Sequence, residues 1–267
     1  MKASEIIVET DRSVSCLFLN NRSSSTPTLF LHGFTGAADS WSEVISKLDS
    51  YAVSVDIVGH GKSTFKDLNS DYSVDDCCED LSEILDSLDI KRLNICGYSM
   101  GGRLAVAFAA RYPDRVEGLL LESACLGIAD KEDRESRYQE DLKLCRAIED
   151  NFAEFVQKWE RNSLFHNQSN RNELGFKKQR EIRLSHNPAQ LSKALRAFSQ
   201  GQMKSYESEF SKFDFPISII NGSDDSRYKL AGKMMSEMNK QATQHVVDNS
   251  NHNVHLESTD AFIDLIK

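Results

Sequence analysis

The chain has 267 residues, 40% of them hydrophobic, with 32 lysines and arginines against 41 aspartates and glutamates and a formal net charge of −9. Non-specific binding to nucleic acid or anionic lipid needs a basic surface, so this balance argues against nucleic-acid and membrane-surface partners. The first residues carry no apolar signal segment, and no stretch approaches the roughly 20 apolar residues of a membrane span, so we expect a cytoplasmic protein.

The first half of the chain alternates apolar runs with helical patterns. Expected strands cover residues 6–8, 14–19, 28–31, 51–56, 93–96 and 116–122, the first two as a hairpin. Expected helices cover residues 39–48, with Asp39 as the cap, then 75–88 and 103–112, the last stopped by Pro113. Strands that alternate with helices predict a mostly parallel central sheet with helices on both faces.

The pattern changes between residues 125 and 206, where the sequence is charged and favours helices. We expect helices over residues 131–150, 152–161, 171–184 and 188–198, forming a helical lid. The sheet resumes at residues 217–220 and 244–247, and residues 258–266 form a closing helix; residues 20–25 form a polar surface turn. The predicted domains are therefore a core of residues 1–124 and 207–267 with residues 125–206 inserted as the lid.

The six cysteines are scattered and lack paired zinc spacings, which indicates reduced thiols. Cys77 and Cys78 form the one adjacent pair. We interpret them as two positions on an ordinary helix rather than as a redox switch.

A serine between two glycines follows the strand at residues 93–96. Residues 97–101 read Gly-Tyr-Ser-Met-Gly, and a helical pattern begins directly after them. A sharp turn from strand to helix leaves no room for side chains beside the serine and lifts its hydroxyl above the sheet edge. The pattern predicts that Ser99 is a nucleophile or base.

An active serine needs a histidine to take its proton and a carboxylate to hold that histidine. In such sheets the acid follows a late strand and the histidine follows the last one. Asp225 and His252 occupy these places. Asp224 is the alternative acid, otherwise a turn or cap residue, and His255 is the alternative base.

The same loops raise the question of a metal, since His252 and His255 with Glu257 nearby could converge on one ion. No third ligand has a sensible spacing, so we predict no metal.

The oxyanion hole requires two backbone N–H groups aimed at developing negative charge. Met100, directly after the serine, supplies one, and Phe34, in the loop after residue 31, supplies the other. We expect His32 and His60 to be structural hydrogen bonders. The glycine-rich loop at residues 59–63 lacks the spacing of a phosphate-binding loop.

These motifs together resemble the α/β-hydrolase superfamily over essentially the whole chain. A narrower set is similar to the MenH family, the 2-succinyl-6-hydroxy-2,4-cyclohexadiene-1-carboxylate synthases. That set comprises residues 97–103, Arg134 and Arg137 followed by Asp141, Trp159 with Phe165, residues 183–188 leading to 199–201, residues 222–228 and residues 251–255.

The resemblance implies an α/β-hydrolase fold and a lyase that removes pyruvate from an enolpyruvyl cyclohexene by 2,5-elimination, without a cofactor. It implies a triad of Ser99, Asp225 and His252. The positions corresponding to the family's substrate-binding residues are Arg103, Arg137, Arg183, Tyr98, Trp159 and Phe165. Two positions depart from the wider pattern, with Val58 in place of proline and Asn251 in place of the glycine before the histidine.

The residue chemistry agrees with a small-molecule polycarboxylate as the partner. A guanidinium binds a carboxylate bidentately, and Arg103 lies one helical turn after Ser99. Two other functions use the same triad: a carboxylesterase or carbon–carbon bond hydrolase, and a small-molecule receptor. Arg103 discriminates against the esterase, because a neutral ester pocket gains nothing from a buried cation. The sequence does not distinguish a monomer from a homo-oligomer.

Overall fold

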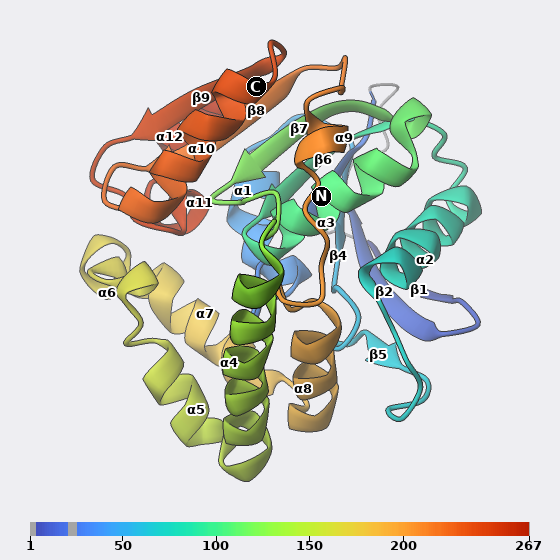
Figure 1. Cartoon of the computed structure of the whole chain (residues 1–267), viewed down its shortest axis with the longest axis vertical. Coiled ribbons are helices and arrows are strands. Elements are labelled where there is room, and N and C mark those ends of the chain that lie inside the picture. Colours follow the sequence, from blue (N-terminus) through green and yellow to red (C-terminus); the bar gives the residue numbers. More distant parts are fainter. Residues whose placement is uncertain (1–3, 21–25, 267) are drawn as a thin grey trace.

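The computed structural model describes residues 4–20 and 26–266 (Figure 1). The predicted polar turn at residues 20–25 lies outside this part of the chain except for Asn20. The strands are β1 (Ser4–Glu9), β2 (Ser13–Asn20), β3 (Thr28–Leu31), β4 (Ala52–Val55), β5 (Thr64–Phe65), β6 (Leu93–Tyr98), β7 (Val116–Glu122), β8 (Ile217–Gly222) and β9 (Ala242–Val247).

The strands form one mostly parallel sheet. Their order is β1-β2-β4-β3-β6-β7-β8-β9, with the short β5 paired to β2. β1 and β2 form the predicted antiparallel hairpin, β2 pairs with β4 antiparallel, and every pairing from β4 to β9 is parallel. Parallel strands present their carboxyl ends at one edge, so the loops after β6, β8 and β9 meet there.

Both faces of the sheet are buried, which explains the continuous apolar runs of the central strands. Successive side chains of a strand point to opposite faces. Leu29 and Leu31 pack in the larger core cluster with α2 (Val74–Ser87) and α3 (Met100–Arg111), whereas Phe30 packs in a second cluster with α1 (Ser42–Ser46) and α12 (Thr259–Ile266).

The insertion between β7 and β8 is helical, as predicted, and its main helices gather at one end of the molecule (Figure 1). They are α4 (Lys131–Asp150), α5 (Phe152–Trp159), α6 (Gln168–Arg171), α7 (Glu173–Ser185) and α8 (Pro188–Ala197), followed by the short α9 (Glu207–Phe210). Of the remaining helices, α10 (Ser226–Met238) follows β8, and α11 (Val254–Glu257) lies between β9 and α12. No helix of the two described ranges is both long and apolar enough to cross a membrane.

The prediction that Asp39 caps a helix is wrong. A 3₁₀ turn covers Ala38–Trp41 before α1. Asp56, directly after β4, accepts the N–H of Ala38 at 2.7 Å and so provides an acceptor for the first amide of this turn. Asp39 instead forms an ion pair with Lys178 of the insertion. A carboxylate remote in sequence has replaced the local cap.

The cysteines lie in the positions expected of unpaired residues. All six cysteines are free thiols. Cys77 and Cys78 are buried residues of α2 in the main core cluster, as expected of ordinary helix positions.

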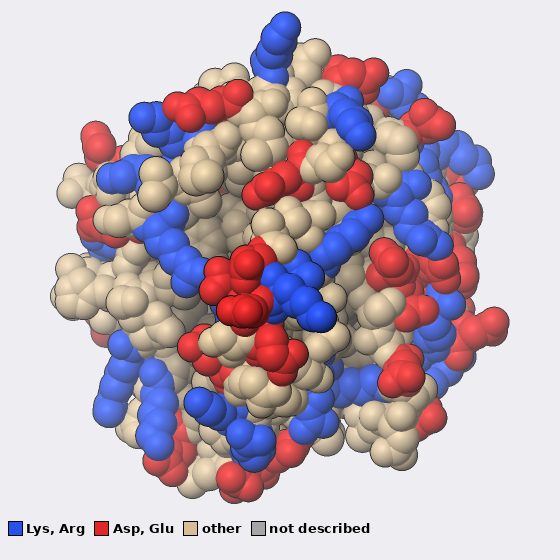
Figure 2. Space-filling model, viewed as in Figure 1, with Lys and Arg blue, Asp and Glu red and all other residues tan. Residues whose placement is uncertain are grey.

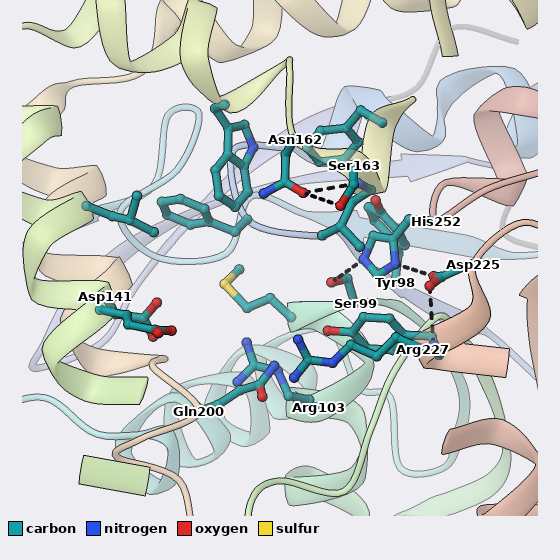
Figure 3. A pocket seen from close by; sticks show the side chains of 18 of the residues that line it. Tyr98, Ser99, Arg103, Asp141, Asn162, Ser163, Gln200, Asp225, Arg227 and His252 are labelled. Atoms are coloured by element: carbon teal, nitrogen blue, oxygen red, sulfur yellow. Dashed lines mark hydrogen bonds and ion pairs between the residues drawn. The ribbon is translucent and has the colours of Figure 1, made fainter. Parts of the chain in front are cut away.

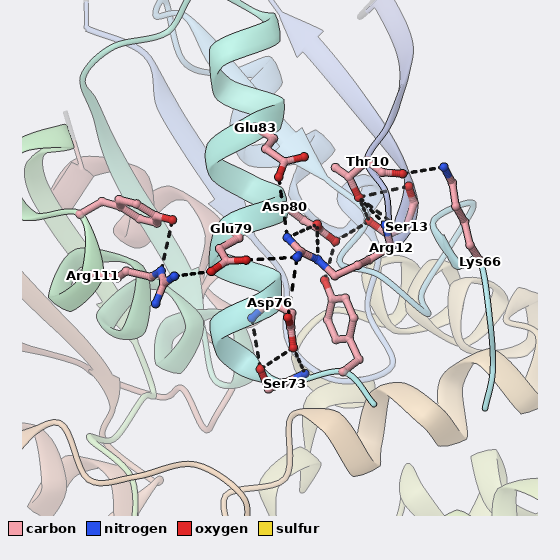
Figure 4. A network of polar contacts seen from close by, with 12 residues as sticks. Thr10, Arg12, Ser13, Lys66, Ser73, Asp76, Glu79, Asp80, Glu83 and Arg111 are labelled. Carbon is pink, nitrogen blue, oxygen red and sulfur yellow. Dashed lines mark hydrogen bonds and ion pairs between the residues drawn. The ribbon is translucent and has the colours of Figure 1, made fainter. Parts of the chain in front are cut away.

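A polar network fastens the β1–β2 hairpin to α2 (Figure 4). Arg12, in the hairpin turn, forms ion pairs with Asp80 at 3.0 Å and Glu79 at 3.1 Å. The buried Asp80 carboxylate also accepts the hydroxyls of Ser13 at 2.7 Å and Tyr72 at 2.8 Å. These bonds satisfy a buried charge, so the edge of the sheet is held by specific polar contacts.

Charges of both signs are interspersed over the face shown in Figure 2, and no broad basic patch gathers there. This distribution agrees with the net charge of −9. Positive charge for an anionic ligand must therefore be concentrated locally.

Candidate active site

Ser99 sits on a strained turn between β6 and α3. Its φ of 52° lies in the left-handed region that non-glycine residues seldom adopt. A side chain at Gly97 would place its Cβ 2.5 Å from the carbonyl oxygen of Gly101, and one at Gly101 would collide with the backbone of Leu31. The two glycines are required by close backbone contact, as the motif predicted.

Ser99, His252 and Asp225 form a hydrogen-bonded chain (Figure 3). His252 Nδ1 lies 2.7 Å from Asp225 Oδ2, and His252 Nε2 lies 2.9 Å from Ser99 Oγ. Because the carboxylate accepts the Nδ1 proton, Nε2 is left to accept the proton of the serine hydroxyl. The side chains of His252 and Asp225 are buried, and Asp225 is held further by the N–H of Tyr228 at 3.2 Å.

The alternative residues have other partners. Asp224 is exposed and pairs with Arg171, which lowers the pKa of its carboxyl. His255 Nδ1 lies 2.6 Å from Glu122 Oε2, and its ring stacks on Trp41 with centroids 4.1 Å apart. His252 and His255 thus face different carboxylates, and no group of three or more metal-ligating side chains occurs among residues 4–20 and 26–266.

The amides expected to form an oxyanion hole lie beside Ser99. Met100 begins α3, so its N–H has no acceptor within the helix. Phe34 follows the end of β3, and both residues line the cavity that contains Ser99. Among the described residues, neither amide donates to a backbone carbonyl outside the helices and strands. The placement fits the role predicted for them.

A cavity of about 700 Å³ lies between the carboxyl edge of the sheet and the inserted helices. It is lined by the triad, by the predicted Tyr98, Trp159 and Phe165, and by residues of α4 and α10. The Trp159 ring packs edge-on against Phe34 with centroids 5.5 Å apart and lies 5.8 Å from Phe165. Aromatic side chains from the insertion therefore cover the wall opposite the sheet.

Arg103 lies in this cavity and is buried without a carboxylate partner. Its Nη1 donates to the carbonyl oxygen of Phe198 and to Met203 Sδ, both at 3.0 Å. No ion pair of the described residues involves it. Burial lowers the pKa of the Arg103 guanidinium. An uncompensated buried cation of this kind is costly unless a ligand supplies the anion.

The other two predicted arginines are placed differently. Arg137 lines the cavity, and its Nε donates to both oxygens of Asp141 at 3.0 and 3.1 Å. Arg183 does not line it; the residue borders a small adjoining space, pairs with Glu160 at 3.2 Å and lies 4.9 Å above the Phe165 ring. The structure therefore brings Arg103 and Arg137 to Ser99 and leaves Arg183 behind the aromatic wall.

His32 has the hydrogen bonds predicted for it, whereas His60 has a single long contact, from Nδ1 to the Val58 carbonyl oxygen at 3.4 Å. His32 is buried, its Nδ1 donates to the Gly33 carbonyl at 2.8 Å and its Nε2 accepts the N–H of Ile57 at 2.9 Å. Burial lowers its pKa to about 4, so it is neutral at pH 7. His60 is also buried, which lowers its pKa well below the usual value. Arg134, from the MenH-like set, donates to the carbonyls of Ile128 and Ala129 outside the cavity.

Known proteins share this arrangement. The family model of the alpha/beta hydrolase fold matches residues 26–259. A putative 2-succinyl-6-hydroxy-2,4-cyclohexadiene-1-carboxylate synthase of Bacillus subtilis (strain 168) is 33% identical over 89% of this chain and 88% of its own length. The chain belongs to the MenH family of α/β hydrolases. The fold class predicted from sequence is thereby confirmed.

Two further MenH-family proteins extend the similarity. The synthase of Enterobacter sp. (strain 638) is 28% identical, with 86% of each chain covered. The solved structure of MenH from S. aureus is 26% identical and superposes with a TM-score of 0.88 over 94% of this chain and 96% of that one. The match includes the insertion as well as the sheet, because so little of either chain is left out.

Two positions where the sequence departs from the wider superfamily have different consequences. Val58 is buried in the main core cluster, so it replaces proline without opening the loop. Asn251 donates from Nδ2 to the Ser163 carbonyl at 2.9 Å, which ties the histidine loop to the insertion. A glycine there would lack this contact.

Sequence reasoning missed Arg227 as a cavity residue. It lies two residues after Asp225 at the start of α10, lines the cavity, and directs its guanidinium toward the same region as Arg103 (Figure 3). The described residues offer it no ion pair, only the ring of Tyr228 at 5.8 Å. Its position in the acid loop was the available signal. Lys143 and Gln200 also line the cavity.

Proposed function

We propose that this chain eliminates pyruvate from 2-succinyl-5-enolpyruvyl-6-hydroxy-3-cyclohexene-1-carboxylate to give 2-succinyl-6-hydroxy-2,4-cyclohexadiene-1-carboxylate, a step of menaquinone biosynthesis. The observation that carries the proposal is the unpaired, buried Arg103 in the same cavity as the Ser99 triad. The names of its MenH-family relatives support the same reaction.

The proposed chemistry begins with proton removal. Ser99, relieved of its own proton by His252, takes the proton from ring carbon 2, next to the succinyl carbonyl. The electron pair forms the double bond between carbons 2 and 3, the former 3,4 double bond moves to carbons 4 and 5, and the bond from carbon 5 to oxygen breaks. Pyruvate leaves as its enolate and gains a proton. Asp225 holds His252 in the tautomer that this relay requires.

The amides of Phe34 and Met100 are proposed to hold the charge that spreads onto the succinyl oxygen. No cofactor takes part, because the substrate carries its own conjugation and leaving group. The substrate has three carboxylates, on the ring, the succinyl group and the enolpyruvyl group. We assign them to Arg103, Arg137 and Arg227, which line the cavity, with Tyr98, Trp159 and Phe165 packing on the ring. Arg183 is proposed to act through Phe165, against whose ring it packs, and through its pair with Glu160.

The inserted helices are proposed to be a lid over this cavity, with residues 125–206 as its extent and the rest of the chain as the hydrolase core. They supply Arg137, Trp159 and Phe165, so the site is complete only with the insertion in place. We place the reaction in the cytoplasm, in keeping with six free thiols.

The test supplies the enolpyruvyl substrate, generated in place by the enzyme that forms it, and follows pyruvate with a coupled dehydrogenase. Wild type should release pyruvate well above the spontaneous rate, and Ser99→Ala should return to that rate. No release from wild type would overturn the lyase assignment. Rapid hydrolysis of p-nitrophenyl esters would instead favour an esterase, and ligand-dependent recruitment of a protein without turnover would favour a receptor.

A further inference from the structure

Arg171, at the end of α6, joins the insertion to both loops that carry the triad. Its guanidinium pairs with Asp224 and, at 2.5 Å, with Glu257. Asp224 directly precedes the acid Asp225, and Glu257 lies in α11, just after the histidine loop. The Arg171 side chain is 17% exposed and that of Glu257 is fully buried, so solvent screens this bridge little.

Glu257 extends the contact to the residue before the base. Its Oε2 accepts the backbone N–H of Asn251 at 2.8 Å. On the other side, the N–H of Asp224 donates to the carbonyl of Ser250 at 3.0 Å, which joins the acid loop to the histidine loop. The cation of Arg171 thus stands at the meeting point of three segments that are distant in sequence.

The insertion has two more contacts at the same place. Asn172 Nδ2 donates to the Leu256 carbonyl at 2.9 Å, and Asn251 Nδ2 donates to Ser163 in the insertion. These are neutral hydrogen bonds, each worth about 1 kcal/mol. The contact of Arg171 differs because it is ionic. Glu257 is a buried carboxylate that needs a counter-charge to stay ionised, and its oxygen accepts the backbone N–H of Asn251.

We propose that Arg171 is a positioning residue, which holds the acid and histidine loops in register and keeps His252 within hydrogen-bond reach of Ser99. It does not line the cavity, so it acts through Asp224 and Glu257 and not on substrate. The proposal rests on the same triad as the proposed function. A chemical probe of Ser99 separates the two, because probe reactivity requires the relay and not the lyase substrate.

The experiment compares Arg171→Gln with wild type and with Arg161→Gln. Arg161 is an exposed arginine of the same insertion that neither lines the cavity nor forms an ion pair within the described chain. Two quantities are measured: the rate at which a small fluorophosphonate labels Ser99, read by intact-protein mass spectrometry, and kcat and KM for pyruvate release. Labelling forms a bond from Ser99 Oγ to phosphorus and expels fluoride as His252 takes the proton.

Arg171→Gln should lower the labelling rate and kcat together, by about tenfold to a hundredfold, because misplacement of a reacting group by 1 Å is enough for such a loss. KM should change less. Arg171→Lys should recover part of the rate, since lysine restores the charge without the bidentate reach. Arg161→Gln should match wild type.

A labelling rate of Arg171→Gln equal to that of wild type would overturn the proposal, whatever the effect on KM. Arg171 would then only attach the insertion to the rest of the chain, without positioning the triad. Should Arg171→Gln fail to fold, the double variant Arg171→Gln/Glu257→Gln removes both charges and keeps an acceptor for Asn251. The same reduced labelling is expected there, and a wild-type rate would again overturn the proposal. Wild type that labels but releases no pyruvate would sink only the lyase.

Discussion

Replacing Arg103 by methionine separates a binding arginine from a structural one. Methionine keeps an unbranched stem of similar course but removes the guanidinium. Arg103 is buried and bonded to the Phe198 carbonyl and Met203 Sδ, and no carboxylate of the described residues pairs with it. The substitution therefore removes a desolvated charge as well as two hydrogen bonds.

The two effects on stability oppose one another. Loss of the hydrogen bonds costs about 1 kcal/mol each, while removal of an uncompensated buried cation returns a similar amount. We expect the free energy of unfolding to change by less than about 1 kcal/mol, a shift in Tm of about 2 to 4 °C at most for a chain of this size. Thermal unfolding monitored by circular dichroism measures it.

The effect on turnover should be far larger. Truncation of one partner of a buried charged hydrogen bond costs about 2 to 5 kcal/mol. The value of kcat/KM for the tricarboxylate should therefore decrease by a factor between about 30 and a few thousand. Hydrolysis of any neutral ester that wild type accepts should fall less than about threefold, because no carboxylate is bound. Equal losses on both substrates, or destabilisation beyond about 3 kcal/mol, would refute the assignment of Arg103 to substrate.

Four other changes follow from the structure. Asp225→Asn should reduce kcat for pyruvate release by about 10⁴-fold while the fold is kept, because the amide favours the wrong histidine tautomer. Arg227→Gln should raise KM for the tricarboxylate about tenfold or more in steady-state assays, with Lys233→Gln, on the same helix but outside the cavity, as the charge-matched control. Arg12→Ala should lower the free energy of urea unfolding by about 2 to 3 kcal/mol, since it leaves the Asp80 carboxylate short of its cation. Burial lowers the pKa of His186 to about 4 in the folded chain, so as the pH falls below 6.5 the unfolded chain binds a proton at this residue before the folded chain does. The free energy of unfolding should therefore decrease less steeply below pH 6.5 in His186→Gln than in wild type.

Each of these has a contradicting result. A kcat of Asp225→Asn within tenfold of the wild-type value would mean that another residue is the acid of the triad. Equal KM values for the Arg227 and Lys233 variants would mean that Arg227 contributes only to the overall charge and does not bind the substrate. Unchanged urea midpoints for Arg12→Ala would show that solvent compensates Asp80. For His186, the wild-type slope between pH 6.5 and 4 should exceed that of the variant by up to about 1.4 kcal/mol per pH unit, and identical slopes would show that the site does not titrate with folding.

The sequence predicts well those features that depend on residues close together in the chain or on the order of the strands. Continuous apolar runs predicted the strands, and the glycines around Ser99 predicted its turn because backbone contact demands them. The acid and histidine followed from the chain order of strands that end at one edge. Asp225 was preferred over Asp224 on spacing, and the hydrogen bond to His252 agrees with that preference.

The features that it missed depend on partners far away in the chain. The cap at residue 39 failed because Asp56 takes the Ala38 N–H. α10 was overlooked since its apolar residues do not lie on one face: Leu230 is 60% exposed and Met234 57%, which blurs the helical period. Arg183 was expected in the cavity, and its partner Glu160, 23 residues earlier, was not foreseen.

The same reasoning explains how a chain with a net charge of −9 can recruit a trianion. Arginines with a carboxylate partner, such as Arg183 and Arg171, form ion pairs that connect parts of the insertion and the loops. Among residues 4–20 and 26–266, no carboxylate pairs with Arg103 or Arg227, and both point into the cavity beside Ser99 (Figure 3). We propose that the field that binds the substrate arises mainly from these two guanidiniums, with Arg137, which is paired with Asp141, as the third arginine of the cavity. A substitution that supplied either with a new carboxylate neighbour should abolish binding as effectively as removing the arginine itself.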